Sequence, residues 1–196
     1  MTPAPALRAR ADRRLRRLRR AELPVDTVEL ARYLIGKVVV HDTDSGRLSG
    51  RIVETEAYPV GDAAGHAFRG KTQRNRSLFL QRGHAYVYLC YGTSFLLNVT
   101  SEMAEVGAGV LLRAIEPMHG VDDMMAGLSG TTRLADLGHD GVDLCDGGAL
   151  WLATTARRAD RIGNSVRIGI TRNADRRLRF YETGNSNVNG AKKMRH

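Results

Sequence analysis

The sequence predicts a single α+β domain built mainly from short strands. Two pairs of apolar segments, within residues 38–58 and 85–100, are each separated by a turn, which is typical of β-hairpins. One short stretch, residues 26–36, has the spacing of an amphipathic helix. The chain has 196 residues, of which 42% are hydrophobic, and this is enough for one domain with its own core.

The first 22 residues are rich in arginine and alanine. Blocks of like charge usually stay disordered and serve as interaction arms. Leu15 and Leu18 are too few to dock this segment firmly, so we expect a flexible basic tail. Whether it binds phosphate or is inert stays open. The folded domain is therefore expected at residues 23–183, followed by a polar, loose tail at 184–196.

The elements of the domain follow in chain order. Asp26 has the place of a helix N-cap and Gly36 that of a C-cap, which delimits a structural helix. A run of Asp, Thr, Ser and Gly at residues 42–46 provides the turn of the first hairpin. Residues 59–76 are a long polar connection, and such connections are usually functional or disordered. Further strands are expected at residues 85–100 (two strands), 109–115, 149–153, 167–170 and 178–181.

The stretch Arg51–Pro59 is the main candidate for an active-site wall. Alternation along a strand puts Glu54, Glu56 and Tyr58 on one face. Two acids beside an aromatic ring fit an active site, but an ordinary half-buried strand with a solvated acidic face fits the same pattern. Arg113, inside a later apolar strand, needs acceptors if it is buried, and Glu54 or Glu56 would be natural partners.

The charge of the chain points to a polyanionic partner. Lys and Arg number 30 against 21 Asp and Glu, a net charge of +9 with a pI near 10.1. Most of these cations are arginines, whose planar donor fork suits phosphate. Nucleic acid is therefore a candidate partner. The alternative is that the charge only keeps the protein soluble.

Several other classes of protein lack support in the sequence. No apolar run approaches the roughly 20 residues of a membrane span, and no apolar segment follows the basic N-terminus as it would in a secretory signal. We expect a protein that is not secreted, acting at the bacterial nucleoid in the cytoplasm or in a eukaryotic nucleus. Cys90 and Cys145 are expected to be reduced thiols. Metal-ligand, P-loop, dinucleotide and nucleophile-elbow motifs are missing, so no cofactor or metal is expected.

The remaining features are a carboxylate, an arginine, several aromatic side chains and a basic surface. A carboxylate can act as a general base on water. Aromatic rings can sandwich a flat base, and an aromatic wedge can replace a base that has left the stack. Tyr91, beside Gly92 at a hairpin end, is an aromatic residue that a core does not need. This combination predicts hydrolysis at a nucleobase extruded from duplex DNA.

Several segments, in order, resemble the alkyladenine (3-methyladenine) DNA glycosylase family. The resemblance implies a compact single domain on a mainly antiparallel β-sheet with peripheral helices. It also implies a monofunctional glycosylase of base excision repair that flips an alkylated purine out of duplex DNA. The matching segments are Arg51–Tyr58, His66, Arg74–Arg76, Tyr86–Gly92, Asn98, Val110–Pro117, Arg167–Ile170 and Leu178–Tyr181.

The resemblance also implies roles in the reaction. Glu56 would activate a water molecule for attack on the sugar C1′, and Arg113 and the backbone carbonyl of Ile168 would help to hold that water. No lysine stands in the matching motifs, so no Schiff base and no strand-cleaving lyase activity are expected. A positive charge on an alkylated purine would make it a better leaving group and strengthen its stacking on tyrosine.

A base pocket and a DNA wedge follow from the same resemblance. Tyr58 and Tyr88 would sandwich the flipped purine, with His66 at its edge. Asn98 would help to reject normal guanine by its bulk. Tyr91 would intercalate into the DNA from the minor groove.

The implied partner is double-stranded DNA containing alkylated or deaminated purines, bound by a monomer. The segment near residues 127–140 departs from the family pattern and looks shortened, which affects the expected DNA affinity more than the chemistry. A noncatalytic binder of damaged or distorted DNA, using the same cleft, is the alternative function. Candidates for contacts with the DNA backbone are Arg69, Lys71, Arg74 and Arg76.

Overall fold

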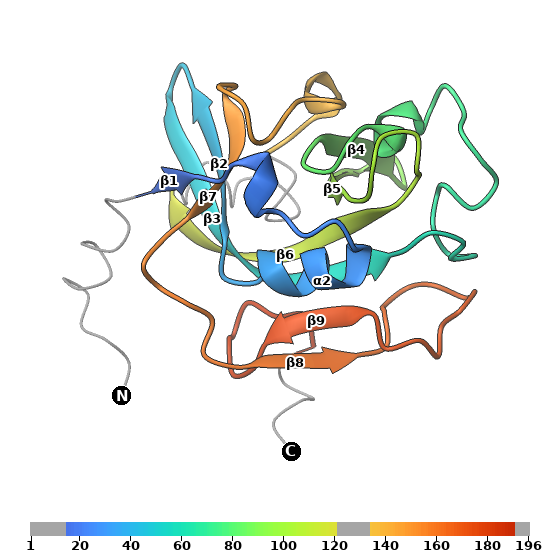
Figure 1. Cartoon of the computed structure of the whole chain (residues 1–196). Helices are drawn as coiled ribbons and strands as arrows, with labels where there is room; N and C mark the ends of the chain where they lie inside the picture. The colour runs from blue at the N-terminus through green and yellow to red at the C-terminus, as the bar shows by residue number, and fades with distance from the viewer. Residues whose placement is uncertain (1–14, 121–133, 191–196) are drawn as a thin grey trace.

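The computed structural model describes residues 15–120 and 134–190, and one antiparallel sheet of nine strands dominates them (Figure 1). The strand order is β1-β7-β2-β3-β6-β5-β4, and β9 and β8 continue from β3. The predicted α+β class with a mainly antiparallel sheet is confirmed. The strands are β1 (Arg16–Arg17), β2 (Val38–Thr43), β3 (Gly46–Tyr58), β4 (Ala85–Cys90), β5 (Ser94–Thr100), β6 (Gly109–His119), β7 (Leu150–Thr154), β8 (Ile162–Ser165) and β9 (Arg179–Glu182).

Helix α2 (Thr27–Leu34) lies against the sheet (Figure 1). The Asp26 carboxylate accepts the backbone N–H groups of the second and third helical residues, so the predicted N-cap is confirmed. The α2 residues Leu30, Ala31 and Leu34 are fully buried in the main core. Within the described ranges no helix is long and apolar enough to cross a membrane. The short 3₁₀ helices are η1 (Arg20–Glu22), η2 (Arg76–Phe79) and η3 (Leu137–His139).

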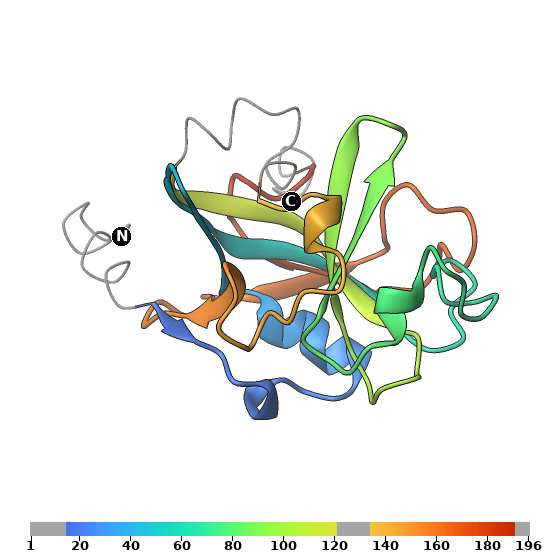
Figure 2. The same cartoon turned by 90° about the horizontal axis from the view of Figure 1, so that it is seen from above.

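Both predicted hairpins are present. β2 and β3 are joined by a two-residue turn, with Thr43 paired to Gly46. β4 and β5 form a hairpin that projects from the body of the sheet (Figure 2), and its turn carries Tyr91 and Gly92, both at positive φ. A positive φ is ordinary for glycine and uncommon for other residues, so the conformation of Tyr91 depends on this tight turn.

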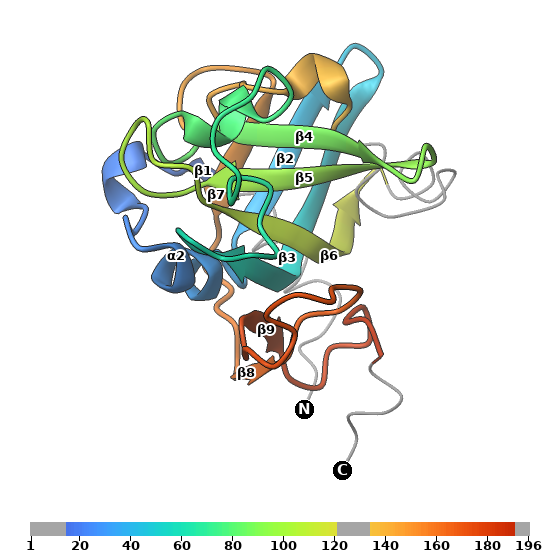
Figure 3. The ribbon, with the colours of Figure 1, turned by 90° about the vertical axis from the view of Figure 1, so that its right-hand side faces the viewer.

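β3 is the central strand of the sheet and is paired on both edges. β6 runs along one edge, while β2 and then β9 share the other, so that β8 and β9 lie beside the end of β3 (Figure 3). The Thr55 hydroxyl donates to the Ala31 carbonyl oxygen of α2 at 2.9 Å, which turns this side of β3 toward the helix. Glu54 and Glu56 therefore point to the opposite side, as the alternation predicted.

The strand predicted at residues 167–170 is absent, and β8 lies upstream at Ile162–Ser165. Gly169 has a φ of +75°, which an extended strand does not allow. The Ile168 N–H is bonded to a side chain instead of a neighbouring strand. The apolar pattern of this segment therefore marks a loop that packs against the sheet rather than a strand within it.

Parts of both predicted tails belong to the fold. Arg16 and Arg17 pair with β7, and Leu18 is fully buried in the core, so the expectation that Leu18 cannot dock this segment is wrong. Near the C-terminus Val188 is buried. The arginines of residues 1–14 lie outside the described residues. So does half of the segment near 127–140, of which the structure describes 134–140.

Leu18 provides a test of this docking. Leu18→Ala is expected to lower the free energy of unfolding by about 2–5 kcal/mol, the usual range for truncating a fully buried leucine. Urea denaturation followed by circular dichroism measures the change. Leu137 is 55% exposed, so Leu137→Ala serves as the control, with a change within about 0.5 kcal/mol. Equal stabilities of the two variants would contradict the docking.

Candidate active site

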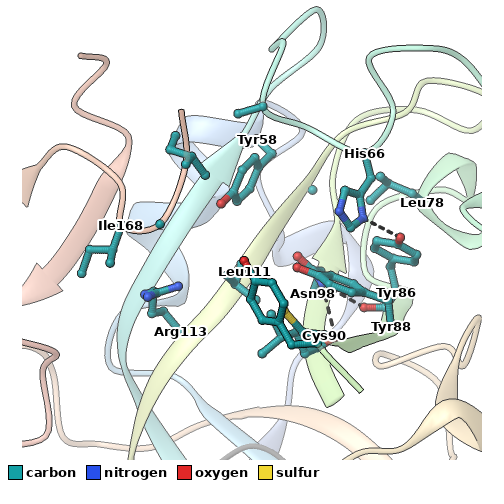
Figure 4. A pocket seen from close by; sticks show the side chains of 16 residues that line it. Tyr58, His66, Leu78, Tyr86, Tyr88, Cys90, Asn98, Leu111, Arg113 and Ile168 are labelled. Carbon is teal, nitrogen blue, oxygen red and sulfur yellow. Dashed lines mark hydrogen bonds between the residues drawn. The ribbon is translucent and has the colours of Figure 1, made fainter. Parts of the chain in front are cut away.

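A cavity of about 310 Å³ opens between the β4–β5 hairpin and the loop around Ile168 (Figure 4). Its floor comes from β3 and β6, and its wall is largely aromatic. A volume of this size suits one flat heterocycle. The side chains and backbone that line the cavity belong to Tyr58, Ala64, His66, Leu78, Tyr86, Tyr88, Cys90, Tyr91, Leu96, Asn98, Gly109, Leu111, Arg113, Ile168, Gly169 and Ile170.

Glu56 lies directly behind this lining and is fully buried. Its Oε2 accepts the Tyr58 hydroxyl at 2.9 Å, and its Oε1 accepts the Ile168 backbone N–H at 2.8 Å. A buried carboxylate needs such donors. The two bonds fix the carboxylate plane and leave some of its roughly four lone-pair sites free.

Arg113 is close to both acids of β3 but is hydrogen-bonded to neither. Its Nε lies 3.6 Å from Glu56 Oε1 and 3.8 Å from Glu54 Oε1. The same Nε is buried without a hydrogen-bond partner among the described residues. The guanidinium lines the cavity, and the side chain is 25% exposed. The structure thus brings Arg113 to the predicted carboxylates and leaves one donor free beside them.

Glu54 serves the structure of the domain. Its Oε1 accepts Arg179 Nε at 2.6 Å, and its Oε2 accepts the Asn189 backbone N–H at 2.8 Å. Its main cation is therefore Arg179 from β9, which sequence reasoning did not identify. The sequence does show an arginine, Arg179, within a predicted short strand. Only the pairing of β3 with β9 identifies this arginine as the partner of Glu54.

The aromatic residues form a connected group on one side of the cavity. His66 Nδ1 lies 2.7 Å from the Tyr86 hydroxyl, and its ring meets Tyr88 edge-on at 4.5 Å between centroids. Burial and the nearby Arg74 lower the pKa of His66, which favours the neutral imidazole at neutral pH. Burial raises the pKa of Tyr86 to about 12, so its hydroxyl keeps its proton. Tyr86 was not predicted as a site residue, although it shares a face with Tyr88.

Asn98 and Tyr91 occupy the remaining predicted positions. Asn98 is buried on β5, and its Nδ2 donates to the Tyr86 backbone oxygen at 3.1 Å. This bond holds the amide against the cavity. Tyr91, at the tip of the β4–β5 hairpin, is 94% exposed and also lines the mouth of the cavity.

The predicted backbone-contact residues lie on the loop after β3 and at the start of η2. Arg69, Arg74 and Arg76 are exposed and make no ion pair with any residue in the two described ranges. Lys71 is different, because its Nζ is 2.8 Å from Glu105 Oε2. Three of the four cations are therefore free to meet phosphate.

The sequence analysis did not predict a buried ion pair that lies under the cavity. Asp62 Oδ2 lies 2.7 Å from Arg167 Nη1, and both side chains are fully inaccessible. Arg167 also donates to the Ala57 backbone oxygen at 2.9 Å. The pair joins the loop after β3 to the loop before β9, next to Tyr58. Asp62 lies in a polar loop, and the surrounding sequence does not distinguish it from an acidic residue on the surface.

Other predicted features of the chain can be placed as well. Cys90 and Cys145 are both free thiols. Burial raises the pKa of Cys145 to about 11, so that thiol is protonated at neutral pH. Within residues 15–120 and 134–190 no group of three metal-ligating side chains comes together.

Known proteins match this chain along most of its length. Residues 21–186 match the model of the family described as Methylpurine-DNA glycosylase (MPG). A protein of Mesorhizobium japonicum is 55% identical over 190 residues, covering 89% of this chain and 91% of the relative. A protein of Paraburkholderia phytofirmans is 48% identical over 191 residues, covering 90% of each. Both carry the name "Putative 3-methyladenine DNA glycosylase". The chain belongs to the methylpurine-DNA glycosylase family.

Proposed function

We propose that this protein is a monofunctional DNA glycosylase that releases alkylated purines from duplex DNA. The observation that carries the proposal is the position of Glu56: a buried carboxylate held rigid directly behind an aromatic cavity of base size. Membership of the methylpurine-DNA glycosylase family supports the substrate class. The partner is double-stranded DNA, and the enzyme acts as a monomer.

Glu56 acts as the general base in this mechanism. It accepts a proton from water while the water oxygen attacks C1′ of the damaged nucleotide. The electron pair of the N-glycosidic bond leaves with the purine. An alkylated purine that carries a positive charge thereby departs as a neutral molecule, which explains why no acid is needed for such lesions. Because water is the nucleophile, no lysine adduct forms and the DNA strand stays intact.

Arg113 supports the attacking water. Its Nε is an unpartnered donor 3.6 Å from a Glu56 oxygen that still has lone pairs available. The guanidinium also lines the cavity, so a water molecule on the cavity side can accept a hydrogen bond from the arginine and donate one to the carboxylate. Ile168 contributes through its N–H, which orients Glu56. The role of its carbonyl in holding the water stays a prediction.

The cavity receives a purine that has been flipped out of the DNA stack. Tyr58 and Tyr88 provide the two ring faces, and His66 meets the edge of the base. Asn98 lines the cavity from β5, where its bulk disfavours the exocyclic amino group of normal guanine. Stacking on electron-rich tyrosine rings is strongest for cationic bases. The same cavity admits deaminated purines, which are flat and lack that amino group.

Tyr91 fills the gap that the flipped base leaves in the duplex. Its ring stands almost free of the protein at the hairpin tip, so it can enter the minor groove without first leaving a packed position. Arg69, Arg74 and Arg76 then meet the phosphates on the loop side of the cavity. A noncatalytic binder of damaged DNA would use the same surface, and base release distinguishes the two functions.

Glu56→Gln is expected to bind lesion-containing duplex as the wild type does but to release the base at least ~100-fold more slowly, because general-base catalysis is worth about 10²–10⁴ in rate. Glutamine keeps the size of the side chain and an acceptor for the Ile168 N–H. Single-turnover release of 3-methyladenine from alkylated duplex measures the rate, and Glu29→Gln on exposed α2 surface is the control.

Normal release by Glu56→Gln would refute the mechanism. Wild-type protein that binds alkylated duplex but leaves no abasic sites after incubation would favour the noncatalytic binder.

Tyr91→Ala is expected to weaken binding to duplex containing an abasic site by roughly 1–3 kcal/mol, the scale of one lost stacking contact. Its unfolding midpoint should not change, because the ring is 94% exposed. Fluorescence anisotropy at fixed salt measures the affinity. Val25→Ala, which also removes exposed apolar surface, is the control and should bind normally. Unchanged affinity of Tyr91→Ala would remove the wedge from the proposal.

A further inference from the structure

Arg167 lies over the ring of Tyr58, with its Cζ 4.6 Å from the ring centroid. Tyr58 lines the cavity, whereas Arg167 does not line it and is fully buried. The guanidinium therefore stacks on the face of the ring that is turned away from the cavity. A base in the cavity would face this cation through the Tyr58 ring.

The charge of Arg167 is compensated by a dedicated carboxylate. Asp62 Oδ2 lies 2.7 Å from Arg167 Nη1, and neither side chain has access to solvent. Asp62 also accepts the Ala64 backbone N–H and the Asn173 side chain. Burial by itself would raise the pKa of Asp62, but these bonds outweigh it and hold the pKa below its ordinary value. Asp62 is thus ionised at neutral pH, and the pair is close to neutral overall.

Without the negative charge of Asp62, Arg167 would repel a positively charged base in the cavity. A purine stacked on the open face of Tyr58 would have its centroid roughly 4.5 Å from the ring, and so about 9 Å from the guanidinium. Both charges would be shielded from bulk water, where charge–charge interactions are stronger than at an exposed surface. A second cation, Arg176, is 3.5 Å from Asp62, but it is half exposed and screened by solvent.

We propose that Asp62 determines specificity for cationic purines. Asp62 neutralises Arg167 behind Tyr58, so the charge of Arg167 does not cancel the attraction between the Tyr58 ring and a positively charged base. The inference rests on the proposed function, because it concerns the same base pocket. Asp62 touches no substrate, and it acts through Arg167 and the ring. Its effect should therefore depend on the charge of the base rather than on the shape of the base.

Two duplexes that resist hydrolysis test this dependence on charge. One contains 3-methyladenine on a 2′-fluoro sugar, which carries the cationic base but resists base loss. The other contains 3-methyl-3-deazaadenine, which has the same shape and no charge. The quantity measured is the ratio of their dissociation constants, neutral over cationic, for each variant. Neither probe requires catalysis, so a defect in the reaction does not affect the result.

In the wild type the cationic probe should bind more tightly than the neutral one. Asp62→Asn should lower the ratio by about tenfold through weaker binding of the cationic probe alone, as expected for one uncompensated charge at this separation. Arg167→Met leaves the carboxylate without its main partner and should raise the ratio. The double variant removes both charges and should return the ratio to near the wild-type value. Asp44→Asn, on the exposed β2–β3 turn, should leave it unchanged.

An unchanged ratio in Asp62→Asn, or equal weakening of both probes, would overturn the inference and leave Asp62 with a purely structural role. If Asp62→Asn does not fold, Arg167→Met decides, because an unchanged ratio there contradicts the proposal equally. Wild-type protein that binds neither probe more tightly than undamaged duplex would refute the proposed function itself, and the inference with it. Wild-type discrimination without an effect of Asp62 would refute the inference alone.

Discussion

Charges buried along β3 must be compensated, and this requirement ties the C-terminal part of the chain to the sheet. A carboxylate inside a protein is strongly disfavoured unless cations or N–H groups satisfy it. Glu54 receives Arg179 from β9, and Glu56 receives the Ile168 N–H from the loop before β9. Three residues before Glu54 on the same strand, Arg51 is buried against Glu182 of β9. β9 is therefore held to β3 by ion pairs in addition to a short ladder of three residue pairs.

This arrangement explains how the cavity gets two walls from distant segments. The β4–β5 hairpin supplies the aromatic wall, and the loop around Ile168 closes the opposite side because its backbone is anchored on Glu56. The side chains that face the cavity are themselves bonded: Tyr86 to His66, and Asn98 to the strand beside it. A site preorganised in this way would need little rearrangement to receive the flat base that we propose as its ligand.

Much of the local structure follows from sequence pattern. Turn residues fix both hairpins, Asp26 caps the helix, and alternation puts Glu54 and Glu56 on one face of β3. The pattern failed where tertiary contacts outweigh local preference. Ile168 sits in an apolar stretch that resembles a strand, yet its N–H is bonded to a carboxylate. Leu18 lies within a run of arginines but is buried because β1 adds to the edge of β7.

The sequence by itself determined the mainly β architecture, the acidic strand and the exposed aromatic hairpin tip, because these depend on residue spacing of two and on turn chemistry. Strand alternation left the two acids of β3 equivalent, and only the family resemblance singled out Glu56. The tertiary structure supplied the physical difference between them, giving Glu54 a buried arginine and leaving Glu56 beside the cavity. It alone also paired Asp62 with Arg167, residues more than a hundred positions apart. The pairing of buried charges depends on how distant segments of the chain pack together. The local sequence pattern carries no information about this packing.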